Sequence, residues 1–322
     1  MTSGGSKPAT PGLPLWRLSD GRTGHDRQAA ALAAELGGGE TVLPVAWPIP
    51  WRWAAPHLLC GMDRLCRDWP EPAGQTLIIG CGRRAALANR WFKRRYGRRV
   101  FTVQILDPRA GRDEFDVLIV PAHDGLSGPN VLPVSGGLHP IDGAWLAAAR
   151  VAWRATFEAL PPPRRLVLIG GGGRRALWRL MAPAVEAARQ SGGSVLVSFS
   201  RRTPARLAGI ARNWLSAVPH FLYTAGEPNP YSGMLAWADR IRVTADSVNM
   251  ISEALACGVP VEMIGRPPSR RHRRFVNKLC PVGLLGTVAV PGKTPCAPLR
   301  ETAGVALHIR RLWEATDRPY RL

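Results

Sequence analysis

The sequence predicts an α/β protein built from two parallel-sheet domains, and three observations support this. Apolar runs of strand length alternate with longer helical stretches, as in βαβ units. This pattern stops at the proline run 161–163 and starts again after it. The length of 322 residues suits two domains of ordinary size. Two successive α/β halves of similar length indicate two Rossmann-like domains that face each other across a cleft.

In the first half, each predicted strand ends in Gly, Pro or Asp, where a turn begins. The strands are expected over 13–18, 76–80, 100–106 and 116–120, and the helices over 27–36, 83–96 and 142–160. Residues 1–12 are rich in Ser, Gly, Pro and Thr, so we expect a disordered N-terminus. The N-terminal domain is therefore placed at 13–160.

The second half repeats the pattern with similar spacing. Its strands are expected over 165–170, 194–199, 221–223, 240–244 and 261–264, and its helices over 177–191, from about 205, over 231–238 and over 248–257. The C-terminal domain is placed at 164–322. We expect the last helix of the chain to pack back on the N-terminal domain.

The chain is strongly basic: 43 Lys and Arg stand against 23 Asp and Glu, a net charge of +20. Such a charge would attract a phosphate-rich partner: a nucleotide, an anionic membrane surface or a nucleic acid. An Arg-rich composition by itself is the alternative explanation. Because the sequence has no helix-turn-helix, zinc-finger spacing or interleaved aromatic and basic residues, nucleic acid is the least favoured of these partners.

Cysteine usage and hydropathy indicate a cytoplasmic protein. The six cysteines form no C-x-x-C pair and no metal-ligand spacing, so we expect reduced thiols and no bound metal. No signal peptide is evident, and the apolar runs fall well short of the roughly 20 residues that span a bilayer. Residues 44–70 alternate Pro and Trp beside Arg, which would let this segment rest on the inner membrane and present a lipid acceptor.

The segment 240–262 carries the most chemistry. A strand ends in Thr-Ala-Asp-Ser, and a helix that contains Glu253 follows. The free N–H groups and the positive dipole end at that helix N-terminus favour a phosphate, and Asp246 or Ser247 would cap it. Glu253, about two turns into the helix, would accept hydrogen bonds from ribose hydroxyls. An ordinary capped helix with an exposed Glu explains the spacing equally well.

Two further loops follow strands of the second half. Arg201 and Arg202 stand in Ser-Phe-Ser-Arg-Arg-Thr-Pro, where bidentate guanidinium groups suit a diphosphate. The alternative is two solvated side chains in a chain that has many Arg. A four-glycine run that includes Gly171 lets a ligand approach the backbone, but it matches neither a P-loop nor a dinucleotide-binding fingerprint.

The first predicted strand–helix turn reads Ser-Asp-Gly-Arg-Thr-Gly-His-Asp over 19–26. It combines Gly21 and Gly24 with Asp20 and His25, either of which could act as a general base toward an acceptor hydroxyl. A tight turn whose Asp caps the next helix is the alternative.

A last, weaker candidate is the loop Gly-Glu-Pro-Asn-Pro-Tyr over 226–231. Its Glu227 and Asn229 could reach a sugar or a base, and the alternative is a loop in which Pro ends a strand.

In combination, these segments resemble the "elongated mitochondria" family of mitochondrial fission proteins, which has a plant member and many bacterial relatives. The resemblance extends from about residue 15 to residue 275. The motifs that carry it are Asp-Gly-x-x-Gly-His at 20–25, Ile-Gly-Gly-Gly at 169–172, Ser-Arg-Arg-Thr-Pro at 200–204, Asn-Pro-Tyr at 229–231 and Asp-Ser-Val-x-Met-x-Ser-Glu at 246–253.

This resemblance implies a GT-B fold, the two-domain architecture of many glycosyltransferases and sugar-nucleotide epimerases. Matching motif to motif, it implies a nucleotide site at Gly171, Arg201, Arg202, Ser247 and Glu253, and an acceptor side at Asp20, Gly21, Gly24 and His25.

We therefore expect a metal-independent GT-B glycosyltransferase that needs no cofactor and takes a nucleotide-diphosphate sugar as its substrate. The alternative is a non-catalytic scaffold that binds a protein partner, as the resemblance to the plant fission factor suggests, because one fold can host both roles.

Overall fold

The computed structural model describes residues 14–316, except for residues 38, 172–173, 201–202, 225, 227, 280–284 and 288–296. The expected disordered N-terminus therefore lies outside the described residues. The chain divides into two compact units. The first consists of Met1–Val134, Leu138–Pro140 and Glu301–Leu322, and the second of Ser135–Gly137 and Ile141–Arg300.

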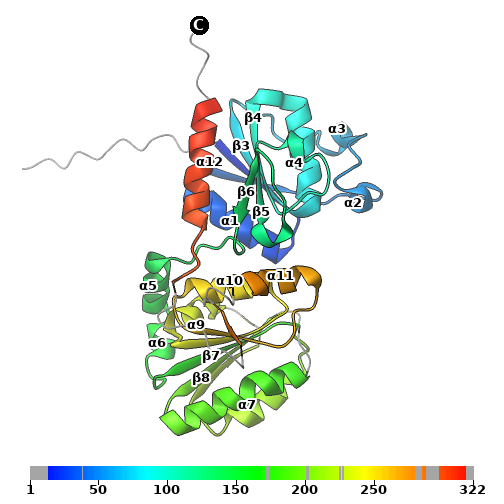
Figure 1. Cartoon of the computed structure of the whole chain (residues 1–322). Helices are drawn as coiled ribbons and strands as arrows, with labels where there is room; N and C mark the ends of the chain where they lie inside the picture. The colour runs from blue at the N-terminus through cyan, green and yellow to red at the C-terminus, as the bar shows by residue number, and fades with distance from the viewer. Residues whose placement is uncertain are drawn as a thin grey trace, which may run out of the picture. The chain divides into compact units, whose positions relative to one another are not determined.

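The first unit is built on a parallel sheet in which the described strands follow the order β2-β1-β3-β4-β5-β6 (Figure 1). These strands are β1 (Pro14–Ser19), β2 (Gly39–Pro44), β3 (Thr76–Cys81), β4 (Val100–Ile105), β5 (Val117–Pro121) and β6 (Val131–Val134). The helices are α1 (Thr23–Leu36), α2 (Trp51–Ala54), α3 (Met62–Leu65), α4 (Gly82–Tyr96) and α12 (Thr302–Thr316), with 3₁₀ turns η1 (Gly97–Arg99), η2 (Arg112–Glu114) and η3 (Ala122–Asp124).

The second unit has its own parallel sheet, with the order β12-β11-β10-β7-β8-β9 among the described strands. These strands are β7 (Arg164–Ile169), β8 (Ser194–Phe199), β9 (His220–Tyr223), β10 (Arg240–Thr244), β11 (Val261–Ile264) and β12 (Gly286–Thr287). The helices are α5 (Gly143–Ala152), α6 (Arg154–Phe157), α7 (Arg174–Ser191), α8 (Leu207–Leu215), α9 (Tyr231–Trp237), α10 (Val248–Ala256) and α11 (Arg270–Leu279).

Each sheet is buried on both faces, as its continuous apolar strands require. In the first unit, α1 and α12 cover one face, where Leu32 and Ile309 join the strand residues in one core. The other face is covered by α4 and by the Pro/Trp segment, whose Trp47 and Trp69 pack into the core. Those two Trp side chains are thus structural, whereas Trp53 in the same segment is 69% exposed.

Several described elements were not predicted from the sequence, among them the strands β2 and β6 and the helix α11. Both strands are at an edge of the first sheet, where apolar alternation is weak and a proline such as Pro133 of β6 is tolerated. In β2, Leu43 alone is buried. In α11 the apolar residues are few among Arg and Lys. None of the described helices has the length and apolarity needed to cross a membrane.

The division between the units differs from the expected boundary at 161–163. Both α5 and α6 belong to the second unit, because Phe157 is fully buried in its core and Trp153 packs against that core. Helix α12, which we expected to pack back on the N-terminal domain, belongs to the first unit, where Arg310 donates a 2.6 Å hydrogen bond to Leu36 O at the end of α1.

Candidate functional site

The centre of the second sheet is its topological switch point. Strands β7 and β10 are neighbours there, and the chain continues from them toward opposite edges of the sheet. Ligands of open α/β sheets bind outside the carboxyl ends of the strands at this point. Gly171 and Asp246, both predicted from the sequence, follow these two strands.

The loops after β7 and β10 are joined directly. Gly171 N–H donates a 2.8 Å hydrogen bond to Asp246 Oδ2, and Gly170 N–H donates one of the same length to Thr244 Oγ1. A Cβ atom added to Gly170 would lie 2.5 Å from Asp246 Oδ2, so a side chain at residue 170 would collide with the carboxylate. The glycines here allow the close approach of two loops.

A third loop is attached at the same place. The Thr203 hydroxyl lies 2.7 Å from Gly170 O and 2.9 Å from Ile169 O, and Ser200 N–H donates to Ile169 O at 2.8 Å. The loop that follows β8 is thereby held against the end of β7. Arg201 and Arg202, the predicted diphosphate ligands in this loop, lie outside the described residues.

Helix α10 begins beside this junction. Ser247 is its N-cap and accepts from Met250 N–H, so the cap is Ser247 and not Asp246. Glu253 is only 5% exposed, which differs from the exposed Glu of an ordinary surface helix. Tyr231 Oη, at the start of α9, donates a 2.6 Å hydrogen bond to Glu253 Oε2.

The loop before α9 has a structural role. Asn229 Oδ1 accepts from Tyr231 N–H at 3.0 Å, so the amide fixes the first residue of the helix. Glu227, the other candidate in this loop, lies outside the described residues.

Both connections that leave the second unit are fixed to α10. On one side, Gly137 N–H donates to Ser252 Oγ at 2.9 Å, and a Cβ on Gly136 would lie 2.7 Å from the same oxygen. On the other, Arg300 Nε donates to Ala256 O at 3.0 Å. The C-terminal half of the helix that carries Glu253 is therefore fixed at two positions, Ser252 and Ala256.

The predicted acceptor loop also lies at a switch point, in the first sheet. Strands β1 and β3 are neighbours there, and the chain turns to opposite sides of them. His25 Nδ1 is 3.0 Å from Asp20 Oδ2, and Asp20 Oδ1 accepts from Arg22 N–H at 3.1 Å. The Asp20 side chain is 1% exposed and that of His25 is 21% exposed. Burial acts to raise the pKa of Asp20, but the interactions with His25 and Arg22 together outweigh it, and the pKa is lowered.

The His25 ring lies directly against the backbone of Gly82, the first residue of α4. A Cβ at Gly82 would be 2.8 Å from His25 Nδ1, and its φ of +77° is a conformation that favours glycine. Of the two loop glycines, Gly21 has a φ of +71° and forms the turn, whereas Gly24 lies in the first turn of α1. The helix thus starts at Thr23, earlier than expected, and carries His25.

Sequence reasoning missed Tyr231, Thr203 and Gly82 as parts of these sites. Each acts on a residue distant in the chain, through a contact that no local pattern encodes. A weak signal was present for Tyr231, because a tyrosine directly after Asn-Pro stands at the start of a predicted helix.

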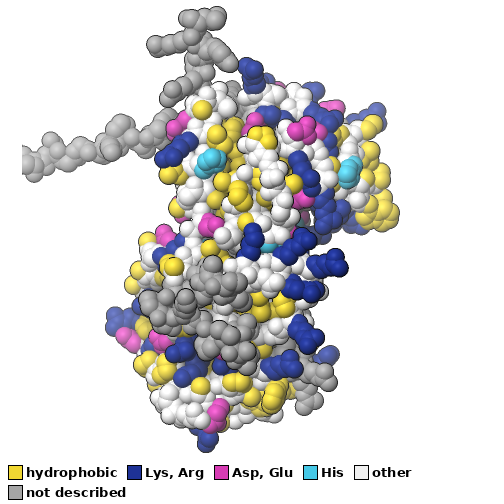
Figure 2. All heavy atoms as spheres, viewed as in Figure 1, with side chains coloured by type: hydrophobic (Ala, Val, Ile, Leu, Met, Phe, Trp, Pro, Cys, Tyr) yellow, Lys and Arg dark blue, Asp and Glu magenta, His cyan; other side chains and the backbone are white. Residues whose placement is uncertain are grey.

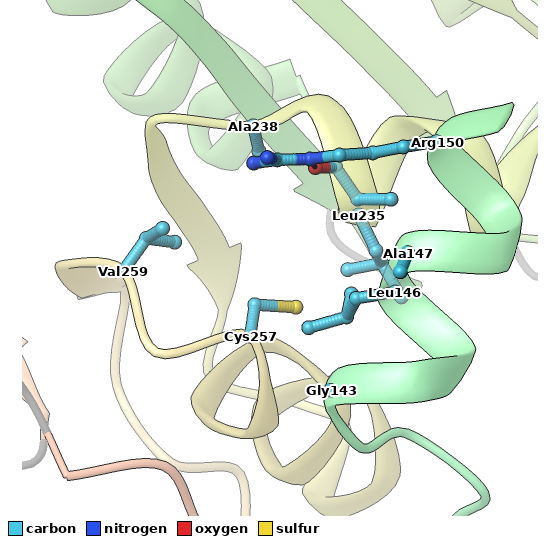
Figure 3. Close-up of a pocket in the computed structure, with 9 residues that line it drawn as sticks. Gly143, Leu146, Ala147, Arg150, Leu235, Ala238, Cys257 and Val259 are labelled. Carbon is cyan, nitrogen blue, oxygen red and sulfur yellow. Dashed lines mark hydrogen bonds between the residues drawn. The ribbon is translucent and has the colours of Figure 1, made fainter. Parts of the chain in front are cut away.

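A pocket elsewhere in the second unit includes none of the predicted residues. It has a volume of about 260 Å³ between α5, α9 and the segment after α10 (Figure 3). Arg150 crosses one side and donates to Ala236 O at 2.6 Å, while the Cys257 thiol points inward. Burial, with a contribution from Glu253, raises the pKa of that thiol to about 12. Cys257 therefore stays protonated and unreactive near neutral pH.

The sequence of the chain matches the profile described as Mitochondrial fission ELM1 over residues 23–313. The chain belongs to this family. It is 32% identical to the mitochondrial fission protein ELM1 of Arabidopsis thaliana over 285 residues, which cover 78% of the chain and 67% of that protein. It is 27% identical to an uncharacterized protein of Rickettsia prowazekii, with coverage of 83% and 88%.

Solved structures confirm the predicted fold class. The UDP-GlcNAc 2-epimerase of Methanocaldococcus jannaschii matches with a TM-score of 0.55 and 12% identity, over 92% of this chain and 91% of that one. MurG of Acinetobacter baumannii matches with a TM-score of 0.52 and 14% identity, over 94% and 93%. The family member described here thus has the GT-B fold of glycosyltransferases and epimerases, with one parallel sheet in each unit.

Proposed function

We propose that the chain binds a nucleoside-diphosphate sugar at the carboxyl edge of its second sheet and transfers the sugar to an acceptor hydroxyl. The observation that carries the proposal is the junction of Gly171 with Asp246 beside the α10 N-terminus and the buried Glu253. The junction and the start of α10 lie at the switch point, where α/β sheets bind nucleotides, and Glu253 belongs to the same helix.

Each part of a nucleotide has a complementary group there. The N-terminal turn of α10 presents backbone N–H groups and a positive dipole end to a diphosphate. The Glu253 carboxylate would accept hydrogen bonds from ribose hydroxyls, held in one orientation by Tyr231. Arg201 and Arg202 remain sequence predictions for the diphosphate. In this proposal they and the helix dipole take the place of a metal.

Asp20 and His25 would provide the base for transfer. In the tautomer in which His25 Nδ1–H donates to Asp20, Nε2 is free to accept a proton. His25 Nε2 would take the proton of the acceptor hydroxyl, whose oxygen forms the new bond to the anomeric carbon. The bond from that carbon to the diphosphate breaks, and the nucleoside diphosphate leaves.

A test of this function needs a ligand panel. The Neisseria meningitidis 2-epimerase, with a TM-score of 0.53 and 11% identity over 94% of this chain and 93% of that one, was solved with UDP-GlcNAc bound, so uridine nucleotides are the first choice. We expect one nucleoside diphosphate to raise the Tm selectively. His25→Ala should keep this shift and lose sugar transfer. If His25→Ala also loses the Tm shift, the proposal that His25 acts on the acceptor and takes no part in nucleotide binding is wrong.

The alternative is a scaffold that binds a protein partner, and the identity to the Arabidopsis fission protein favours it. In that case no nucleotide in the panel would raise the Tm. Substitutions at Glu253 and His25 would then leave partner binding unchanged.

A further inference from the structure

Helix α11 lies within a long stretch of sequence that has no negative charge. Between Glu262 and Glu301 the chain contains no Asp or Glu. The exposed cations of α11 and of the turn before it are Arg266, Arg270, Arg271, Arg273, Arg274 and Lys278.

These cations share one face of the helix. Phe275, Val276 and Leu279 form the opposite face and are buried in the core of the second unit. At about 100° per residue, the four Arg and the Lys of α11 then point outward over roughly 160° of the helix circumference. Figure 2 shows dark-blue side chains gathered where Figure 1 draws α11.

Much of this charge is not neutralised within the protein. Among the described residues, no ion pair joins Arg266, Arg270, Arg273 or Arg274 to an acid. Nearby on the sheet, Arg242 does have a partner, Glu262, at 2.9 Å. Within the described part of the chain, Arg266, Arg270, Arg273 and Arg274 therefore contribute their charge to an outward electrostatic surface.

We propose that this cationic face docks on a bilayer that contains anionic lipid. A bilayer surface demands only positive charge at the right density, and the face offers little else. Of the exposed α11 residues, Asn277 alone is uncharged. Nucleic acid is less well matched, because α11 exposes no aromatic side chain to stack on bases and few amide or hydroxyl groups to read them.

The docking is electrostatic and superficial. The apolar residues of α11 are used in the protein core, so the helix contacts lipid headgroups without inserting into the acyl region. Each Lys or Arg near an anionic surface raises the affinity by about five-fold at moderate salt. Four such residues would together contribute roughly 600-fold. Added salt would weaken the attraction, because it shortens the Debye length over which the surface charge acts.

The experiment is co-sedimentation of the full chain with two kinds of vesicle, phosphatidylcholine alone and an equal mixture of phosphatidylcholine with phosphatidylglycerol. The test variant is Arg266→Gln/Arg270→Gln/Arg273→Gln/Arg274→Gln. The matched control, Arg179→Gln/Arg206→Gln/Arg212→Gln/Arg240→Gln, removes the same charge from exposed positions elsewhere in the second unit. Circular dichroism and Tm establish that both variants fold.

We expect wild type and control to sediment with the anionic vesicles and to be released from them by salt. Neither should sediment with vesicles of phosphatidylcholine alone. The α11 variant should bind at least about 100-fold more weakly. Equal losses in both variants, or no wild-type binding to anionic vesicles, would overturn the proposal. Tighter binding to duplex DNA than to vesicles, lost in the α11 variant, would assign the face to nucleic acid instead. The inference does not rest on the proposed nucleotide site, and vesicle binding is read without any nucleotide.

Discussion

Tyr231 Oη donates a 2.6 Å hydrogen bond to Glu253 Oε2 and so ties the start of α9 to the middle of α10. Tyr231 is itself held by Asn229, which accepts from its backbone N–H. The buried carboxylate thus has a fixed orientation before any ligand arrives. Such pre-organisation lowers the entropy that a ligand must lose on binding.

Tyr231→Phe should weaken nucleotide binding by about 5- to 10-fold, because the Glu253 side chain is then no longer held in one orientation before the ligand binds. The ring and its packing remain, but the Tm should fall modestly because the buried Glu253 carboxylate loses a donor. Tyr223→Phe is the matched control: it also removes a tyrosine hydrogen bond in the second unit, from Tyr223 Oη to Gly226 O. Isothermal titration with UDP measures both. Equal affinities for Tyr231→Phe and wild type would show that the hydroxyl does not position Glu253.

Gly170→Ala should destabilise the protein by about 1–3 kcal/mol, because the new methyl group overlaps the Asp246 carboxylate. Asp246→Ala removes the obstacle, although it also removes the acceptor for Gly171 N–H. In a double-mutant cycle followed by urea unfolding, the double variant should be more stable than the sum of the single changes predicts. Strict additivity would contradict the steric contact.

Gly82→Ala should displace the His25 ring and lower sugar transfer, with donor affinity unchanged. Gly97→Ala serves as control, because Gly97 also has a positive φ, of +55°, but no atom lies within 4 Å of a Cβ placed there. Both variants place a side chain at a positive φ, and only Gly82→Ala adds the collision. If transfer activity falls equally in both, the contact between Gly82 and His25 is irrelevant to it.

Glu114 should stabilise the first unit in a pH-dependent way. It pairs with Arg90 at 2.5 Å and with Arg94 at 2.8 Å. Burial acts to raise the pKa of Glu114, but the two guanidinium groups lower it from 4.5 to about 2. Because the folded pKa is depressed, the stabilisation is complete above pH 4.5 and is lost as the pH falls toward 2.

The corresponding variant is Glu114→Gln, which leaves the buried Arg90 without its carboxylate. We expect a loss of about 2 kcal/mol in the free energy of unfolding at neutral pH. The difference from wild type should shrink below the usual Glu pKa. Glu158→Gln, which breaks the exposed pair with Arg154, should change stability far less. A difference that persists unchanged in acid would exclude the ion pair as its cause.

Most of the fold could be predicted from the sequence, because buried parallel strands leave strong apolar runs. The second half is the clearest case, where β8 and β10 were predicted with the bounds that the structure has. Edge strands such as β2 lack that signal, since most of their side chains are exposed. The unit boundary was misplaced for a different reason: proline runs mark turns, but core packing decides which unit a helix joins.

The residues of a candidate site could be predicted from the sequence where they belong to one loop or one helix. Ser247 and Glu253 stand on one helix, and Asp20 and His25 in one turn, so spacing alone brought each pair together. By contrast, the contact of Gly82 with His25 and that of Tyr231 with Glu253 join separate elements. Such pairs depend on how strands are ordered in a sheet, and a single sequence does not state that order.

The central claim, a nucleotide site at Glu253, is tested most directly by isothermal titration of UDP and the other nucleoside diphosphates. The proteins are wild type, Glu253→Ala and the control Glu186→Ala, whose carboxylate lies on the surface of α7. We expect one nucleotide to bind wild type and control equally, and Glu253→Ala about 10- to 100-fold more weakly. Absence of binding by every nucleotide, or equal affinity in Glu253→Ala, would contradict the donor site and favour the scaffold.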